Sequence, residues 1–186
     1  AFEAVAAIGR PVMVDNNAAR VGGSRAPSLT AQLAAIPNIA AYKESARDLY
    51  AVAELYYATR DRLAHFAGLE PYAGALLSRG ASGVVSTISN VCAREVVGCY
   101  NAYRANDAAA LSRNQQVIDE MYHLLARSGL SNFAFVKSAM AALGRPGGAT
   151  RRPHRSADEA QIARIGSDIK AIYARAGIGA DATLAA

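Results

Sequence analysis

Long apolar runs are absent from this 186-residue sequence, because no stretch of about 18 residues is apolar without an interrupting charge. We therefore expect no segment that spans a membrane. Residues 1–11 carry no basic segment ahead of an apolar run, which argues against a secretory signal. Only two cysteines occur, Cys92 and Cys99, which is too few for a disulfide scaffold. These absences make the cytoplasm the expected compartment.

Charged residues are also scarce, at 19% of the chain against 52% hydrophobic residues. This balance excludes a disordered tail, a collagen-like fibre and a low-complexity linker, because all three lack apolar material for a core. A chain of this length buries roughly 70% of its extended surface on folding. We therefore expect a well-packed core.

The net charge of +5 and the pI of 9.4 raise nucleic acid as a partner. Four excess positive charges, however, lie in the Gly- and Pro-rich segment 144–155, which is typical of a solvated connection between helices. The sequence has no aromatic-rich basic strand and no zinc-finger spacing. We expect no nucleic-acid partner. The alternative, a basic-segment binder, predicts salt-sensitive binding through Arg151, Arg152 and Arg155.

Short apolar runs bounded by turn residues alternate with helical patterns in the first part of the chain. The strands that they predict start 20 to 27 residues apart, as in repeated βα units, and each strand is expected to be buried on both faces of a parallel sheet. After Arg104 only helices are predicted. The predicted strands are 12–14, 39–42, 63–66 and 83–86. The predicted helices are 28–36, 46–59, 69–79, 90–104, 107–127, 132–143 and 156–176.

Two architectures use successive βα units: a doubly wound open sheet and a closed (β/α)8 barrel of the TIM type. The open sheet usually has a glycine-rich phosphate-binding turn after its first strand, and here that turn reads Asp15-Asn16-Asn17. Polar residues instead follow the strands, where a barrel places its active site. Those residues are Asp15, Lys43, Gly68 and Ser86.

The barrel is therefore the preferred α/β fold, although only four βα units are present. Eight units need about 250 residues. We expect residues 1–105 to form the second half of a barrel, comprising its last four units. Residues 106–186 are expected to form a C-terminal helical extension.

Lysine is rare in this chain, with only Lys43, Lys137 and Lys170 among its 20 cationic residues. Lys43 differs from the other two because it closes the apolar run 39–42 at the end of a predicted strand. Loss of hydration there favours the neutral amine, which can attack a carbonyl and form a Schiff base. The alternative is a solvated rim lysine that pairs with Glu44.

The sequence positions of the histidines do not indicate a catalytic role. His65 lies within a predicted strand and is expected to be a hydrogen-bonded core residue. No spacing of His, Asp and Glu indicates a metal site.

Three ordered segments resemble one enzyme family. Residues 37–48 read Pro-Asn, an apolar strand and then Lys-Glu, which resembles the Schiff-base strand of the dihydrodipicolinate synthase / N-acetylneuraminate lyase family. Residues 11–22 resemble the fifth strand of that family, and residues 80–91 resemble the eighth. Arg151-Arg152-Pro153 is similar to its Arg-Pro-Pro stretch. The resemblance extends over residues 1–176.

The resemblance implies a class I lyase or aldolase that makes or breaks a carbon–carbon or carbon–oxygen bond. Lys43 would form a Schiff base with pyruvate or a related 2-oxo acid, and neither a metal nor another cofactor is implied. A homo-oligomer, either a dimer or a tetramer, is expected. The resemblance also implies a set of substrate-binding residues. They are Asn16, Arg20, Gly68, Gly83 and Val85.

Two departures from the family pattern matter. The proton-relay tyrosine of the family aligns with Asp15, whose carboxylate is ordinarily a weaker base than a phenol. Asp15 is therefore either the acid/base or an ion-pair partner that opposes the nucleophilicity of Lys43. The carboxylate-binding loop that follows the family's second strand is also absent. Either the sequence is a fragment of a longer product, or another polypeptide completes the barrel. The alternative function is an impaired or incomplete family member with a structural or regulatory role.

Overall fold

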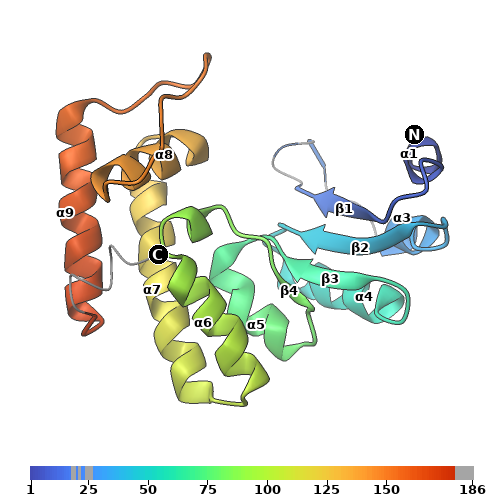
Figure 1. The fold of residues 1–186 in the computed structure, drawn as a ribbon. Helices are drawn as coiled ribbons and strands as arrows, with labels where there is room; N and C mark the ends of the chain where they lie inside the picture. Colours follow the sequence, from blue (N-terminus) through green and yellow to red (C-terminus); the bar gives the residue numbers. More distant parts are fainter. Residues whose placement is uncertain (18–19, 21, 24–26, 179–186) are drawn as a thin grey trace. The chain divides into compact units, whose positions relative to one another are not determined.

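The computed structural model describes residues 1–17, 20, 22–23 and 27–178, and Figure 1 shows the order of their elements. The chain forms two compact units, residues 1–85 and residues 86–186. The expected division at residue 105 concerns the barrel and its extension, and it stays a prediction.

The first unit contains one parallel four-stranded sheet with the order β1-β2-β3-β4. This sequential order is what consecutive βα units of a barrel produce, so the expected α/β architecture is confirmed. The strands are β1 (Val12–Asn16), β2 (Ile39–Glu44), β3 (Ala64–Ala67) and β4 (Gly83–Val84). The helices are α1 (Phe2–Ala6), α3 (Pro27–Leu33), α4 (Leu49–Thr59), the 3₁₀ helix η1 (Glu70–Tyr72) and α5 (Ala73–Ser78).

Local chemistry explains where two predicted helices differ from the observed ones. Helix α4 begins at Leu49, three residues later than predicted, because Asp48 has extended dihedral angles and caps the helix. Its carboxylate accepts hydrogen bonds from the backbone N–H groups of Tyr50 and Ala51. The predicted helix 69–79 instead forms η1 and α5, with Pro71 in the first turn of η1.

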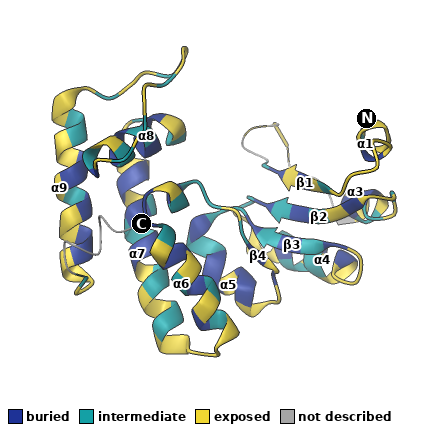
Figure 2. Cartoon of the chain, in the orientation of Figure 1, coloured by how far each residue is buried: buried dark blue, intermediate teal, exposed yellow. Residues whose placement is uncertain are grey.

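The sheet is buried on one face only, as the alternation of buried and exposed residues along β1 shows (Figure 2). Val14 is buried and packs in a cluster with Tyr42 of β2 and Leu55 of α4, whereas Met13 is 42% exposed. Successive side chains of a strand point to opposite faces, and the helices of this unit bury only one of them. The prediction that each strand is buried on both faces was therefore wrong for this chain.

His65 is buried on the helix-covered face of β3, as the sequence predicted. Its Nε2 lies 2.9 Å from the Oγ1 atom of Thr59, and that hydroxyl donates to the carbonyl of Leu55. The Thr59 proton is thus already used, so Nε2 carries the ring proton and donates. Burial lowers the pKa of His65 to about 4, which keeps the ring neutral in the fold.

The pKa of His65 makes stability depend on pH. Between pH 6.5 and pH 4 the unfolded chain takes up a proton at His65 that the folded chain does not. The free energy of unfolding should fall as the pH is lowered through this window, by up to about 3 kcal/mol, and then level off. Chemical denaturation of the wild type and of His65→Gln measures the difference. Equal pH profiles would contradict the assignment, and His123→Gln controls for the loss of a histidine.

The second unit is helical and corresponds closely to the prediction. In α7, the predicted apolar stripe of Val117, Met121, Leu124 and Leu125 is buried. Helix α9 begins at Glu159, because Asp158 and Gln161 form a capping box. The elements are η2 (Ile88–Asn90), α6 (Ala93–Arg104), α7 (Ala108–Arg127), α8 (Asn132–Ala142) and α9 (Glu159–Arg175).

The segment between α8 and α9 is only partly the solvated connection that was expected. Arg151, Arg152 and Arg155 are exposed. Arg145 instead donates from Nη1 to the carbonyls of Asn90 and Val91, each at 3.1 Å. The composition of the segment predicted its three exposed arginines but not the one that is anchored.

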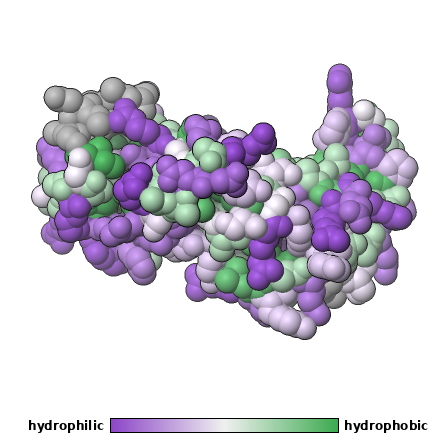
Figure 3. All heavy atoms as spheres, turned by 90° about the horizontal axis from the view of Figure 1, so that it is seen from below, coloured by the Kyte–Doolittle hydropathy of each residue, from purple (hydrophilic) through white to green (hydrophobic). Residues whose placement is uncertain are grey.

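Over the described ranges, no helix combines the length and the apolar character that crossing a membrane requires. On the face drawn in Figure 3, hydrophobic residues form small separate patches among hydrophilic ones. Cys92 and Cys99 are buried free thiols.

Candidate active site

Parallel pairing aligns four residues in one row across the sheet. Asp15 of β1 pairs with Lys43 of β2, Lys43 with Phe66 of β3, and Phe66 with Gly83 of β4. The row lies near the carboxyl ends of the strands. Because side chains alternate, it belongs to the face opposite the one that buries Tyr42 and His65. A carboxylate, an amine and an aromatic ring therefore occupy neighbouring positions on one face.

Lys43 and Asp15 form an ion pair. The Nζ atom of Lys43 lies 3.0 Å from Oδ2 of Asp15, with the lysine side chain 19% exposed and the aspartate 51% exposed. Lys43 is thus mostly buried, as expected, but its partner is Asp15 and not Glu44. The carboxylate of Asp15 is placed to exchange a proton with the amine of Lys43.

Gly68 makes room for Lys43. Its N–H donates to the carbonyl of Glu44 at 2.7 Å, so its backbone passes directly beside β2. A Cβ atom at Gly68 would lie 2.8 Å from Cε of Lys43, and closer still to Oγ of Ser45. No L side chain fits there without displacing the lysine or the serine.

Substitution of Gly68 tests this packing. Gly68→Ala should lower the free energy of unfolding by about 1–3 kcal/mol, because the added methyl group overpacks the space beside Lys43. Gly23→Ala is the matched control, since a Cβ there meets no atom of the described residues within 4 Å, and it should change stability by less than about 0.5 kcal/mol. Chemical denaturation measures both. Equal stability of the two variants would show that the chain relaxes around the methyl group.

Asn16 lies on the other face of the sheet from Lys43. It is buried, and its Nδ2 donates to both carboxylate oxygens of Glu44 at 3.0 and 3.1 Å. The Glu44 carboxylate also accepts the N–H of Ala46 at 2.6 Å. Burial raises the pKa of Glu44, while these hydrogen bonds partly oppose the shift. The structure therefore gives Asn16 a role in joining β1 to β2 and does not bring its amide to Lys43.

The remaining predicted residues are less tightly grouped. Gly83 lies in the row, and a Cβ there would come within 3.1 Å of the Phe66 ring. Val85 donates its N–H to the carbonyl of Ala67, and its side chain is partly exposed. Arg20 is exposed, and its neighbours 18, 19 and 21 lie outside the described residues, as do parts of the 11–22 motif.

Sequence reasoning missed two residues beside Lys43. Phe66 shares its row, and the period-2 alternation of a strand paired with β2 could have placed it there. Ser45 has a buried Oγ that makes no hydrogen bond within the described chain, and nothing in the pattern marked it. Among the described residues, no group of three or more His, Cys, Asp or Glu side chains is arranged to hold a metal ion.

Four parallel βα units with a lysine near the carboxyl end of one strand define part of a TIM-type barrel with its candidate site at the usual end. The sequence model of the Dihydrodipicolinate synthetase family matches residues 1–172. The chain therefore belongs to this family, and the resemblance seen in the three motifs is confirmed.

Curated relatives agree with this assignment. The chain is 44% identical over 169 residues to an "Uncharacterized DapA-like lyase" of Rhizobium meliloti, which covers 91% of this chain and 56% of the relative. It is 32% identical over 163 residues to "4-hydroxy-tetrahydrodipicolinate synthase 1" of Streptomyces coelicolor, covering 88% and 53%. The chain thus spans about half the length of the curated relatives that it matches.

Solved structures share the fold. A dihydrodipicolinate synthase from Aquifex aeolicus superposes with a TM-score of 0.82 at 22% identity, covering 91% of this chain and 58% of that one. YagE, a prophage protein of the same family from E. coli K12 in complex with pyruvate, gives 0.78 at 20% identity, covering 87% and 56%. At these identities the likeness establishes the fold alone.

Proposed function

We propose that this chain supplies the Schiff-base lysine of a class I lyase or aldolase that acts on pyruvate or a related 2-oxo acid. The observation that carries the proposal is Lys43 itself. It is mostly buried near the carboxyl end of β2, inside the family motif, and its amine lies 3.0 Å from a carboxylate. Pyruvate bound to a protein of the same fold, YagE, supports the substrate class.

The chemistry follows from the Lys43–Asp15 pair. The ammonium of Lys43 gives one proton to Asp15, and the neutral amine attacks the keto carbon of the 2-oxo acid. Asp15 returns the proton to the carbinolamine hydroxyl, which leaves as water, and an iminium remains on Lys43. The iminium withdraws electrons, so a carbon–carbon or carbon–oxygen bond next to it can break, or form in the reverse direction.

Binding of the substrate carboxylate requires more groups than Lys43 and Asp15. The chain alone provides four βα units, and a carboxylate needs several aimed donors to be held. Arg20 is the candidate anchor that this half contributes, beside the backbone at Gly68, Gly83 and Val85. As the family resemblance implies, the working form is a cytoplasmic homo-oligomer, a dimer or a tetramer, with neither metal nor other cofactor.

A second function is favoured by one observation. The position that carries a tyrosine in the family carries Asp15, and its carboxylate holds the Lys43 amine in an ion pair. A family member with Asp15 in place of the tyrosine can persist as a catalytically impaired structural or regulatory subunit.

Borohydride trapping separates the two functions. Incubation with pyruvate and borohydride should add the mass of one reduced pyruvate to a peptide containing Lys43, because borohydride reduces the iminium to a stable amine. Lys43→Ala should lose the adduct completely. Lys170→Ala removes an exposed lysine of α9 and should keep it. Absence of any adduct on the wild-type chain supports the impaired subunit instead.

Asp15→Asn tests the proton transfer. An amide neither accepts nor returns the proton, so the rate of adduct formation at neutral pH should fall at least tenfold, within the range of general acid–base catalysis. The rate is measured by quenching the trapping reaction at intervals. A faster reaction would show that Asp15 only restrains the amine. Asp48→Asn, which alters the cap of α4 and leaves Lys43 intact, controls for loss of a carboxylate.

A further inference from the structure

A cavity lies in the helical unit, between α7 and α9. It has a volume of about 260 Å³, slightly below the ~300 Å³ at which ligand pockets usually begin, so it suits a small molecule. Arg127 of α7 and Arg164 and Gln161 of α9 line it. It involves none of the residues proposed for the Schiff-base site.

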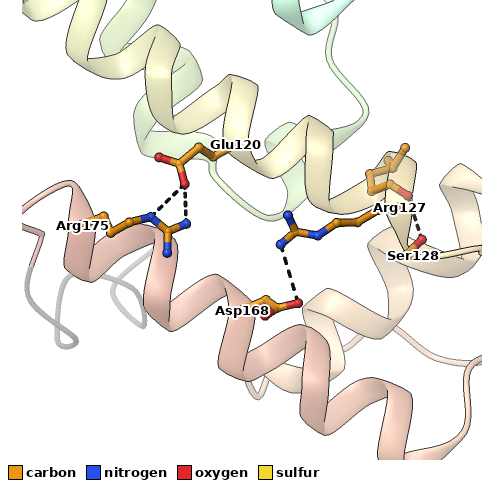
Figure 4. Close-up of polar contacts among 6 residues, drawn as sticks. Glu120, Arg127, Ser128, Asp168 and Arg175 are labelled. Atoms are coloured by element: carbon orange, nitrogen blue, oxygen red, sulfur yellow. Dashed lines mark hydrogen bonds and ion pairs between the residues drawn. The ribbon is translucent and has the colours of Figure 1, made fainter.

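Hydrogen-bond donors at this cavity are largely unused. The guanidinium group of Arg164 makes no ion pair or hydrogen bond to any other residue that the structure describes. The Nη2 atom of Arg127 is 3.8 Å from Oδ2 of Asp168, too far for a hydrogen bond, and Arg127 remains 62% exposed. Figure 4 shows Arg127 reaching from α7 towards Asp168 on α9. Gln161 accepts the N–H of Asp158 through Oε1, which leaves its amide NH₂ as a donor.

Apolar side chains form part of the wall of the cavity. Leu124 and Ile165 line it and are buried in the packing of α7 against α9. A ligand that filled the space would therefore place a hydrocarbon part on these two side chains and a charged part near the guanidinium groups.

Asp168 limits the charge of such a ligand. Its carboxylate lies at the same cavity, so a second negative charge on the ligand would be repelled, whereas one is balanced by Arg127 and Arg164. A guanidinium group also matches a carboxylate in planar, two-pronged geometry.

We propose that this cavity binds a small monocarboxylate with a short branched hydrocarbon chain. Arg164 and Arg127 hold the carboxylate, Gln161 donates a further hydrogen bond, and Leu124 and Ile165 receive the hydrocarbon. Because the ligand joins α7 to α9, its binding stabilises the helical unit by mass action.

Isovalerate is the probe for the first test. Titration of the full chain should shift the backbone amide resonances of residues 161–168 in a saturable manner, and calorimetry should give the same affinity. Arg164→Gln and Arg127→Gln should each weaken binding about tenfold or more, as expected for loss of a charge-assisted hydrogen bond. Arg113→Gln removes an exposed arginine of α7 outside the cavity and should leave the affinity unchanged.

Comparison of ligands tests the two halves of the site separately. Acetate should bind at least tenfold more weakly than isovalerate, because it lacks the hydrocarbon that contacts Leu124 and Ile165. Inorganic phosphate should also bind more weakly than isovalerate. Asp168→Asn should reduce this difference in affinity, because it removes the carboxylate that repels the second negative charge of phosphate. Lys43→Ala should bind isovalerate normally.

Three results would overturn the proposal. One is the absence of saturable isovalerate binding, and another is equal loss of affinity in Arg113→Gln and in the two cavity variants. The third is binding of inorganic phosphate as tight as that of isovalerate, which would indicate an unselective cationic surface.

Discussion

The pairing register of β1 with β2 decides which chemistry appears on each face of the sheet. Asp15 lies opposite Lys43, and Asn16 lies opposite Glu44. A slip by one residue would turn every side chain of a strand to the other face, so the ammonium of Lys43 would enter the core. Burial of Val14 and Tyr42 against the helices opposes such a slip, because it would expose both. The apolar packing on one face thus fixes the amine on the other.

This register also separates two carboxylates that are close along the strands. Asp15 is half-exposed and shares its environment with a cation, whereas Glu44 is buried and its pKa is raised. The amide of Asn16 and the backbone N–H of Ala46 satisfy the buried carboxylate. The carboxylate of Asp15 is half open to solvent, whereas that of Glu44 is held by hydrogen bonds inside the fold. Their different surroundings, and not their chemical type, determine this division.

Residue patterns predicted the fold well and the site in part. Turn residues and helical periodicity located the strands, and the helices other than α1, to within a few residues, because these signals are local. Lys43 emerged from its position at the end of an apolar run and from the family motif. The partner of Lys43 was left open between Asp15 and Glu44, since the choice depends on which side chains share a face. The buried Ser45 hydroxyl and the space at Gly68 depend on three-dimensional packing, which no local pattern encodes.

Burial of the sheet was mispredicted for a related reason. An apolar run indicates that a strand belongs in a barrel, but not whether this chain covers both of its faces. Met13 and Asp15 are exposed here because helices of the first unit bury only the opposite side chains. The same apolar run is compatible with a strand covered on one face and with a strand covered on both, so the sequence pattern does not distinguish them.

Arg145 gives the connection between α8 and α9 an architectural importance that its composition conceals. Its guanidinium holds two carbonyls that precede it by 55 and 54 residues, next to the start of α6. The Arg145 side chain thus closes a long loop of the chain. The helices within that loop also order it, so Arg145 does not bear the whole entropic cost of closure. Insertions near the exposed Arg151 would leave the hydrogen bonds of Arg145 intact. Lengthening the end of α8 would instead move Arg145 away from the carbonyls of Asn90 and Val91. The part of the connection around Arg151 can therefore change in length during evolution, whereas the part that leads from α8 to Arg145 cannot.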